Sequence, residues 1–204
     1  MTWKNDQVSE EETTRLLTLA RKSLNVEGDY VEMGCYRGDT SLLLAEILRD
    51  FNRSSTVENS VEKSAKKLWI YDSFEGLPEK ADEDASALGV DFRKGELAVT
   101  KREVKARFLR AGLPVPVIKK RWFSELTGAD MPEKIAFAFL DGDLYESIRD
   151  SLRLVGPRMA ESGIIVVHDY NNPALPGVAK AVDEYLAGRE CQTELYQSMI
   201  IIYC

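Results

Sequence analysis

Short apolar runs and longer amphipathic segments take turns along the chain. In the amphipathic segments, apolar residues return to one face every three to four positions, as in helices. We expect helices at residues 10–24, 41–51, 100–111, 145–155 and 177–187. The apolar runs are short and rich in branched and aromatic residues, as strands are. We expect strands at residues 29–33, 67–71, 115–119, 135–140 and 163–167.

The order of these elements predicts the fold class. Strands that alternate with helices form a parallel sheet with helices on both faces. Two further apolar runs, 194–196 and 199–203, are separated by Ser198 and resemble a β-hairpin. A final antiparallel strand is common at the edge of such sheets. We therefore expect an α/β fold, a doubly wound, mostly parallel seven-stranded sheet with an antiparallel C-terminal edge strand.

Local signals support two helix starts and one irregular segment. Ser9 with Glu12, and Thr100 with Glu103, have the spacing of capping boxes. The charged segment at about 78–98 has no clear periodicity before residue 95, and we expect it to form a mobile loop or lid. With no repeat or low-complexity stretch, we expect residues 1–204 to form a single domain.

Composition narrows the class of protein. The 204 residues are 44% hydrophobic and 30% charged, with a net charge of −7. An acidic surface repels phosphate backbones, so we expect no nucleic-acid partner. There is no apolar leader and no stretch long enough to span a bilayer, so we expect a cytoplasmic protein without a membrane partner. Three cysteines without paired spacing predict neither a disulfide framework nor a zinc site.

The turn after the first strand is a candidate ligand loop. In an open α/β sheet, ligands bind beyond the carboxyl ends of the strands. Gly34 directly follows the strand, and Gly38 lies where the next helix begins. Glu32 places an acid in an apolar strand end, which is costly unless something binds it. The third glycine of a dinucleotide motif is missing, so a ligand without phosphate, such as S-adenosylmethionine, fits better. A tight turn without a ligand remains the alternative.

Asp72 follows the second strand, where doubly wound folds commonly hold ribose hydroxyls. A helix or turn cap is the alternative role for this carboxylate. Together, the two strand ends favour a nucleoside site more strongly than either does alone.

Two aspartates follow two buried strands. Asp141 is the second residue of the run LDGDLYES, and Asp169 lies in the run VHDYN. Consecutive parallel strands are usually neighbours, about 4.8 Å apart, so the two carboxylates should lie side by side. Such a pair repels unless a proton or cation lies between its members, which predicts a divalent metal. The alternative is that one aspartate caps a helix while the other faces water.

His168 is the only histidine of the chain and precedes Asp169. It could serve as a metal ligand, as a general base near neutral pH, or as a core residue. The sequence leaves these three roles open.

Several segments together resemble the macrocin O-methyltransferase (TylF/MycF-type) family. They read VEMGCYRGDTS, YDSFEGLPE, GELAVTKREV, RWFSELTGADMPEKIAFAFLDGDLYESI and HDYNNPALPGVAKAVDEY, from about residue 30 to residue 185. The resemblance implies a Rossmann-like class I methyltransferase sheet, S-adenosylmethionine as donor, and Mg²⁺-dependent transfer to a hydroxyl, often on a sugar of a natural product.

The resemblance also implies residue roles. The methionine end of the donor would be held by Glu32, Gly34, Cys35, Tyr36, Gly38, Thr40 and Ser41. Asp72 would hold the ribose, Ser73 would lie near the adenine, and Trp122 and Phe123 would occupy the adenine side. Asp141 would contact the donor as well as the metal, with Asp169 and His168 as further metal ligands and catalytic groups.

One position departs from the family pattern. The family usually has two adjacent acids after the fifth strand, and here the first is His168. A nitrogen ligand suits Mn²⁺, Fe²⁺ or Zn²⁺ better than Mg²⁺, and the departure is also compatible with a weakened or absent metal site.

Three other functions stay open. The same sheet with a metal could support hydroxylase-like chemistry. Methyl transfer to nitrogen or carbon would need no metal. A non-catalytic protein could bind S-adenosylmethionine without turnover. We expect a small-molecule acceptor; its identity and whether the chain forms a homo-oligomer are not evident from the sequence.

Overall fold

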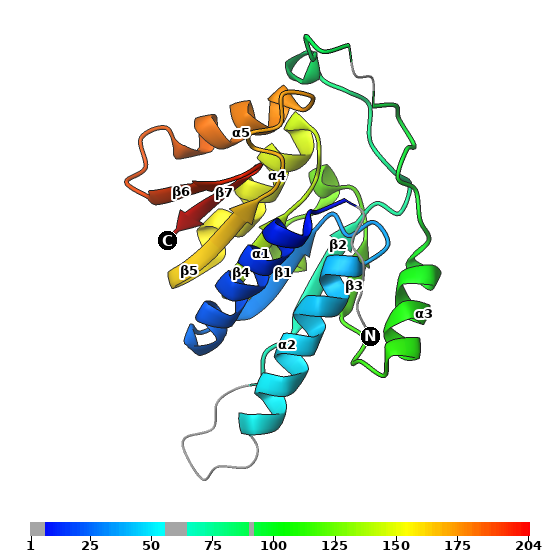
Figure 1. Cartoon of the computed structure of the whole chain (residues 1–204), viewed down its shortest axis with the longest axis vertical. Helices are drawn as coiled ribbons and strands as arrows, with labels where there is room; N and C mark the ends of the chain where they lie inside the picture. The colour runs from blue at the N-terminus through cyan, green and yellow to red at the C-terminus, as the bar shows by residue number, and fades with distance from the viewer. Residues whose placement is uncertain (1–6, 56–64, 90–91) are drawn as a thin grey trace.

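The computed structural model describes residues 7–55, 65–89 and 92–204. Within these ranges, seven strands form one sheet in the order β3-β2-β1-β4-β5-β7-β6 (Figure 1). The strands are β1 (Asp29–Met33), β2 (Leu68–Asp72), β3 (Val117–Lys120), β4 (Ile135–Leu140), β5 (Met159–Val167), β6 (Gln192–Tyr196) and β7 (Met199–Tyr203). The longer helices are α1 (Glu10–Lys22), α2 (Asp39–Ser55), α3 (Lys101–Ala111), α4 (Tyr145–Val155) and α5 (Pro176–Leu186).

The pairing of the strands matches the predicted fold class. β1 pairs in parallel with β2 on one side and β4 on the other, and β5 pairs in parallel with β4. β7 is antiparallel to β5 and to β6, so the C-terminal hairpin closes one edge. The chain leaves β1 toward β2 and returns beside β1 as β4. This reversal opens a crevice at the carboxyl ends of β1 and β4, where ligands bind in such sheets.

Helices cover both faces of the sheet because strand residues alternate in direction. Tyr30 and Phe137 pack with residues of α1, α2 and α3 in one buried cluster. Val31 and Ala138, their chain neighbours, pack with residues of α4 and α5 in a second cluster. Figure 1 shows α1 and α2 in front of the sheet and α4 behind it.

Most predicted elements are present, with shifted ends. Both predicted capping boxes form, at Ser9 with Glu12 and at Thr100 with Glu103. The helix expected at residues 41–51 was predicted to end too early, because residues 52–55 extend α2. The Asn52 side-chain amide exchanges two hydrogen bonds with the Lys66 backbone, at 2.9 and 3.0 Å, and these bonds tie the helix end to the start of β2. Residues 56–64 lie outside the described ranges.

Backbone hydrogen bonds join the two ends of the segment at 78–98, which is expected to be a lid. Leu77 donates its N–H to Glu96 O at 2.8 Å, and Gly95 donates to Leu77 O at 2.9 Å. The two ends of the loop are therefore held together. Inside it, the buried Asp84 carboxylate accepts the Tyr145 N–H at the start of α4, at 2.8 Å. Movement of this segment remains a prediction.

Two further expectations concern the chain as a whole. Cys35, Cys191 and Cys204 are all free thiols, as expected. No helix in the described ranges is both long enough and apolar enough to cross a membrane.

Candidate functional site

A pocket opens at the carboxyl edge of the sheet, beyond β1, β2, β4 and β5. Most of the residues singled out from the sequence line it: Glu32, Gly34, Cys35, Tyr36, Thr40, Asp72, Ser73, Trp122, Phe123, Asp141, His168 and Asp169. Gly38 and Ser41 are not among the lining residues and act through the shape and contacts of the loop after β1. The fold therefore gathers side chains from four strand ends into one hollow.

The glycines of the β1–α2 loop are required by backbone geometry. Gly34 has a φ of +87°, and a Cβ there would lie 1.9 Å from the Asp141 carbonyl oxygen. The close approach is thus to the end of the neighbouring strand β4. Gly38 has a φ of +79°, and a Cβ there would come within 3.2 Å of Val104 Cγ1. Both positions favour glycine because L residues rarely adopt positive φ.

Asp72 fixes the same loop from the adjacent strand. Its Oδ2 accepts the N–H groups of Cys35 at 2.9 Å and Tyr36 at 3.2 Å. Its Oδ1 accepts the N–H of Phe74 at 2.7 Å, closing the turn after β2. A carboxylate has about four lone-pair sites, so it retains acceptor capacity toward the pocket. Asp72 therefore caps a turn, which is the alternative role considered for it. This role leaves the carboxylate able to accept a hydrogen bond from a ligand hydroxyl as well.

Glu32 is an acid buried in the sheet. It is 1% exposed, and the Ser41 hydroxyl donates a hydrogen bond to its Oε2. Burial raises the pKa of Glu32 to about 8, opposed by the Ser41 hydrogen bond, and the negative charges of Asp141 and Asp72 raise it further. The sequence predicted that this buried acid needs a binding partner. Within the chain, that partner is Ser41.

An aromatic pair forms another part of the wall. Trp122 follows β3 and caps the short 3₁₀ turn Phe123–Glu125. The Phe123 ring approaches the backbone at Gly142, where an added Cβ would lie 3.3 Å from its Cε2. The two rings therefore supply apolar surface between the ends of β3 and β4.

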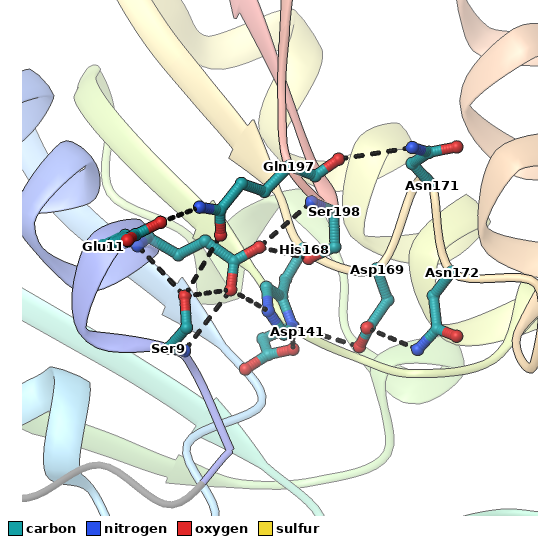
Figure 2. Close-up of polar contacts among 10 residues, drawn as sticks. Ser9, Glu11, Asp141, His168, Asp169, Asn171, Asn172, Gln197 and Ser198 are labelled. Carbon is teal, nitrogen blue, oxygen red and sulfur yellow. Dashed lines mark hydrogen bonds and ion pairs between the residues drawn. The ribbon is translucent and has the colours of Figure 1, made fainter.

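Asp141, His168 and Asp169 form a compact cluster. β4 and β5 are parallel neighbours whose last paired residues are Leu140 and Val167, so Asp141 is level with His168. Asp141 and Asp169 lie close together, as predicted, with one oxygen of each within 4.8 Å of the other. His168 Nδ1 lies 3.0 Å from Asp141 Oδ1 and 3.0 Å from Asp169 Oδ2. Asp169 has a φ of +59°, so the chain turns sharply after His168 and both side chains remain at the edge of the pocket. Figure 2 shows the two carboxylates and the imidazole converging.

His168 is also held from behind. Its Nε2 lies 3.8 Å from Glu12 Oε2, and its side chain is only 7% exposed. Burial lowers the pKa of His168, but the carboxylates of Asp141, Asp169 and Glu12 outweigh this effect and hold it well above its ordinary value. The same contact, with the hydrogen bonds from Ser198 and Ser9, holds the pKa of Glu12 below its ordinary range, although burial opposes the shift.

The donor set of this cluster fits one divalent ion. One ligand atom from each of Asp141, His168 and Asp169 lies within 4.8 Å of the others. Two carboxylates and an imidazole are ligands for Mn²⁺, Fe²⁺ and Zn²⁺, whereas Mg²⁺ prefers oxygen throughout. A carboxylate behind the imidazole is the usual outer partner of a metal-ligating histidine.

Sequence reasoning missed several pocket residues. Asp143 and Ser147 line the pocket beside Asp141. Burial raises the pKa of Asp143, and Asp141 and Asp169 raise it further. Asp143 belongs to the LDGDLYES run, so its proximity to Asp141 in the sequence was the available signal. Val8 and Gln7 also line the pocket, and no sequence pattern pointed to them.

Comparison with solved structures defines the class of protein. The structure of the O-methyltransferase NovP matches with a TM-score of 0.73 at 28% identity, over 92% of this chain and 78% of that one. A calicheamicin methyltransferase matches in fold, with a TM-score of 0.72 at 20% identity, over 96% of this chain and 80% of that one. The seven-stranded sheet is that of a class I methyltransferase.

The sequence comparisons identify the family. The model of the macrocin-O-methyltransferase (TylF) family matches residues 16–200, and the chain belongs to this family. One relative, from Streptomyces olivaceus, is 33% identical over 78% of this chain and 58% of its own length. Its name is 8-demethyl-8-(2,3-dimethoxy-alpha-L-rhamnosyl)-tetracenomycin-C 4'-O-methyltransferase. Demethyldecarbamoylnovobiocin O-methyltransferase of Streptomyces niveus is 32% identical over 84% of this chain and 63% of its own length. The chain thus spans about three fifths of the length of these curated relatives.

Proposed function

We propose that this chain carries the donor site and the catalytic site of an S-adenosylmethionine-dependent O-methyltransferase. The observation that carries the proposal is the single pocket that joins the glycine loop and Asp72 to the Asp141–His168–Asp169 cluster. Membership of the macrocin-O-methyltransferase family supports the same chemistry.

The donor would lie along the β1 and β2 ends of the pocket. S-adenosylmethionine supplies an activated methyl group when it is bound. The loop from Gly34 to Gly38, with Glu32, Thr40 and Ser41 around it, would hold its methionine part. Asp72 and Ser73 would bind the ribose and border the adenine, whose other side would face Trp122 and Phe123. The polar and aromatic lining of the pocket supports this order.

The acceptor hydroxyl would lie at the opposite end, beside Asp141 and Asp169. A divalent ion bound there would lower the pKa of the hydroxyl, as metals do for water. Asp141, Asp169 and His168 Nδ1 would hold the ion, with the nitrogen favouring Mn²⁺, Fe²⁺ or Zn²⁺ over the Mg²⁺ usual for the family. Asp143, a further carboxylate that lines the pocket, would take the proton of the hydroxyl. His168 would take this role instead only where it does not ligate the ion.

The acceptor would be a small natural product with a free hydroxyl on a sugar. Two relatives are named for O-methylation of a rhamnosylated tetracenomycin and of a novobiocin precursor, which supports this class. The net charge of −7 gives no support to a nucleic-acid acceptor.

We also propose that the chain acts as one domain with a lid. Two buried clusters that share one sheet support a single domain. Leu77, Pro78 and Leu97 line the pocket at the two ends of the 78–98 segment. Closure of this segment over bound donor would exclude water from the reaction.

The test is turnover with S-adenosylmethionine and a panel of glycosylated natural products that carry free sugar hydroxyls. We expect product that gains one methyl group, loss of turnover with a chelator, and recovery with added Mn²⁺. Asp141→Ala should abolish turnover while leaving binding of S-adenosylhomocysteine largely intact.

The competing functions give different results in the same assay. Product that gains an oxygen atom would indicate hydroxylase-like chemistry. Methylated product in the presence of chelator would contradict metal assistance, and methylation on nitrogen or carbon would exclude O-methylation. Donor binding without product from any acceptor would indicate a binding protein.

A further inference from the structure

Glu12 lies in the first turn of α1, outside the 16–200 region that matches the family. Its Oε2 accepts the Ser9 hydroxyl at 2.8 Å and the Ser9 N–H at 3.3 Å. Its Oε1 accepts the Ser198 N–H at 3.0 Å and the Ser198 hydroxyl at 2.5 Å. Glu12 therefore joins the start of α1 to the turn between β6 and β7. Figure 2 shows Ser9, Ser198 and His168 close to one another.

The same carboxylate contacts the imidazole of His168. Oε2 of Glu12 is 3.8 Å from Nε2, while Nδ1 on the other edge of the ring is 3.0 Å from both Asp141 Oδ1 and Asp169 Oδ2. The ring thus has one nitrogen toward Glu12 and the other toward the site. Both side chains are buried, at 6% exposure for each residue, so water is a poor substitute for either partner.

A helix cap alone does not require this burial. The chain contains a second capping box with the same residue types, in which Glu103 bonds the N–H and hydroxyl of Thr100 at 2.8 and 2.6 Å. Glu103 is exposed. Glu12 makes the corresponding cap and in addition contacts Ser198 and His168. The comparison separates the capping role from the contact with the imidazole.

We propose that Glu12 is a positioning residue: its carboxylate, 3.8 Å from Nε2 of His168, attracts the hydrogen on that nitrogen and so leaves Nδ1 as the nitrogen ligand of the metal site. The inference rests on the proposed function, because it assumes a divalent ion held by Asp141, His168 and Asp169. Carboxylates behind ligating histidines fix both the tautomer and the ring orientation, and their loss typically costs about 10–100-fold in metal affinity.

The contact also couples the site to distant parts of the chain. Glu12 accepts hydrogen bonds from Ser198, in the turn that leads into β7. β7 pairs with β5, and His168 directly follows β5. Through Glu12, the nitrogen that faces the pocket is set by α1 and by the C-terminal hairpin together. A substitution at Glu12 should therefore change the metal site without changing the donor loop.

The experiment measures binding of Mn²⁺ to the purified chain by electron paramagnetic resonance. Free Mn²⁺ gives the affinity, and the ¹⁴N hyperfine coupling of the bound ion reports coordination by imidazole. We compare the wild type with Glu12→Gln, Glu103→Gln and His168→Ala, and we record thermal unfolding and S-adenosylhomocysteine affinity for each.

We expect Glu12→Gln to weaken Mn²⁺ binding by about 10-fold or more and to alter the ¹⁴N coupling. His168→Ala should lose the coupling. Glu103→Gln makes the same substitution in the matched capping box and should keep both the affinity and the coupling of the wild type. Binding of S-adenosylhomocysteine should stay unchanged in all variants. If Glu12→Gln does not fold, Glu12→Asp, which draws the carboxylate back by one methylene, should weaken Mn²⁺ binding in the same direction.

Two results would overturn the inference in distinguishable ways. If the wild type binds Mn²⁺ with ¹⁴N coupling and Glu12→Gln binds it equally, Glu12 is a helix cap only and the proposed function stands. If the wild type binds no Mn²⁺, metal assistance and the role of Glu12 fail together, while methyl transfer is judged by the turnover assay.

Discussion

The Asp72 carboxylate, at the end of β2, accepts the backbone N–H of Cys35, in the loop after β1, at 2.9 Å. This bond joins two neighbouring strand ends across the pocket and shapes the loop proposed to hold the donor. The side chain that would bind the ribose therefore also positions the loop that would bind the methionine part.

Asp72→Asn should weaken binding of the methyl donor by more than the loss of one contact with the donor would, because Asp72 also shapes the loop after β1. An amide nitrogen in place of one carboxylate oxygen would face the N–H of either Cys35 or Phe74, so at least one donor loses its acceptor. We expect a loss of about 10-fold or more in S-adenosylhomocysteine affinity, measured by calorimetry, and a lower unfolding temperature. Asp82→Asn, at an exposed position of the 78–98 segment, is the control and should leave both unchanged. Wild-type affinity in Asp72→Asn would contradict the assignment.

Gly34→Ala should strongly destabilise the fold. Its φ is +87°, and a Cβ would lie 1.9 Å from the Asp141 carbonyl oxygen, a backbone atom that cannot move aside cheaply. We expect a loss of at least ~3 kcal/mol in the free energy of unfolding, measured by denaturant titration.

Gly89→Ala is the matched control for that substitution. Gly89 also has a positive φ, +66°, but no atom of the described residues lies within 4 Å of an added Cβ. It should cost about 1 kcal/mol, the price of the backbone conformation alone. Equal losses in the two variants would contradict the close approach of β1 to β4.

Glu32→Gln should reveal a pH dependence of stability. Burial raises the pKa of Glu32 to about 8 in the folded chain, from an ordinary value of 4.5. Between these two values the folded state keeps a proton that the unfolded state has released. The contribution of Glu32 to stability therefore falls as pH rises from about 4.5 to about 8, and is constant above.

Glutamine cannot ionise and still accepts the Ser41 hydrogen bond. The unfolding temperature of Glu32→Gln should therefore rise relative to that of the wild type as the pH increases from 5 to 8, by about 5 °C or more. The measurement is thermal unfolding of both proteins at matched pH. A difference that is constant with pH, or that shrinks, would show that Glu32 is ionised throughout.

Asp84→Ala should release the 78–98 segment from the body of the protein. The Asp84 side chain accepts the Tyr145 N–H at 2.8 Å and the Ala81 N–H at 3.0 Å, and the residue is 1% exposed. Removing it leaves two donors without this acceptor, at about 1–3 kcal/mol each where they stay buried. We expect faster limited proteolysis within 78–98 and weaker donor binding, because Leu77 and Leu97 line the pocket.

Asp82→Ala tests whether this effect is specific. Asp82 and Asp84 are the first and last residues of the short 3₁₀ turn Asp82–Asp84, and Asp82 is exposed. It should leave both the proteolysis rate and the donor affinity near those of the wild type. Equal proteolysis of the two variants would show that Asp84 does not anchor the segment.

The sequence predicted the elements well where the signal is local. The capping residues Ser9 and Thr100 and the apolar runs of β4 and β7 depend on neighbours a few positions away, so their patterns are visible in one dimension. The end of α2 was predicted too early because Asn52 is polar, and its partner, Lys66, lies beyond a segment that no local pattern connects to it.

The candidate site divides in the same way. The chain order of β4 and β5 made the meeting of Asp141 and Asp169 predictable, because consecutive parallel strands are usually neighbours. The reason for Gly34 could not be read in advance, since the atom it avoids belongs to Asp141, which follows β4 much later in the sequence.

By itself, the sequence determined the class of fold, the glycine loop and the acids at the strand ends. These features follow from hydrophobic periodicity and from the order of the elements along the chain, which can both be read directly from the sequence. Only the tertiary structure decided which partners the acidic side chains have. It bonded Asp72 to the loop beside it, buried Glu32 against Ser41, and placed Glu12 behind His168. The physical reason is that hydrogen-bond partners and burial are set by how the layers pack, and packing brings together residues that no sequence interval relates.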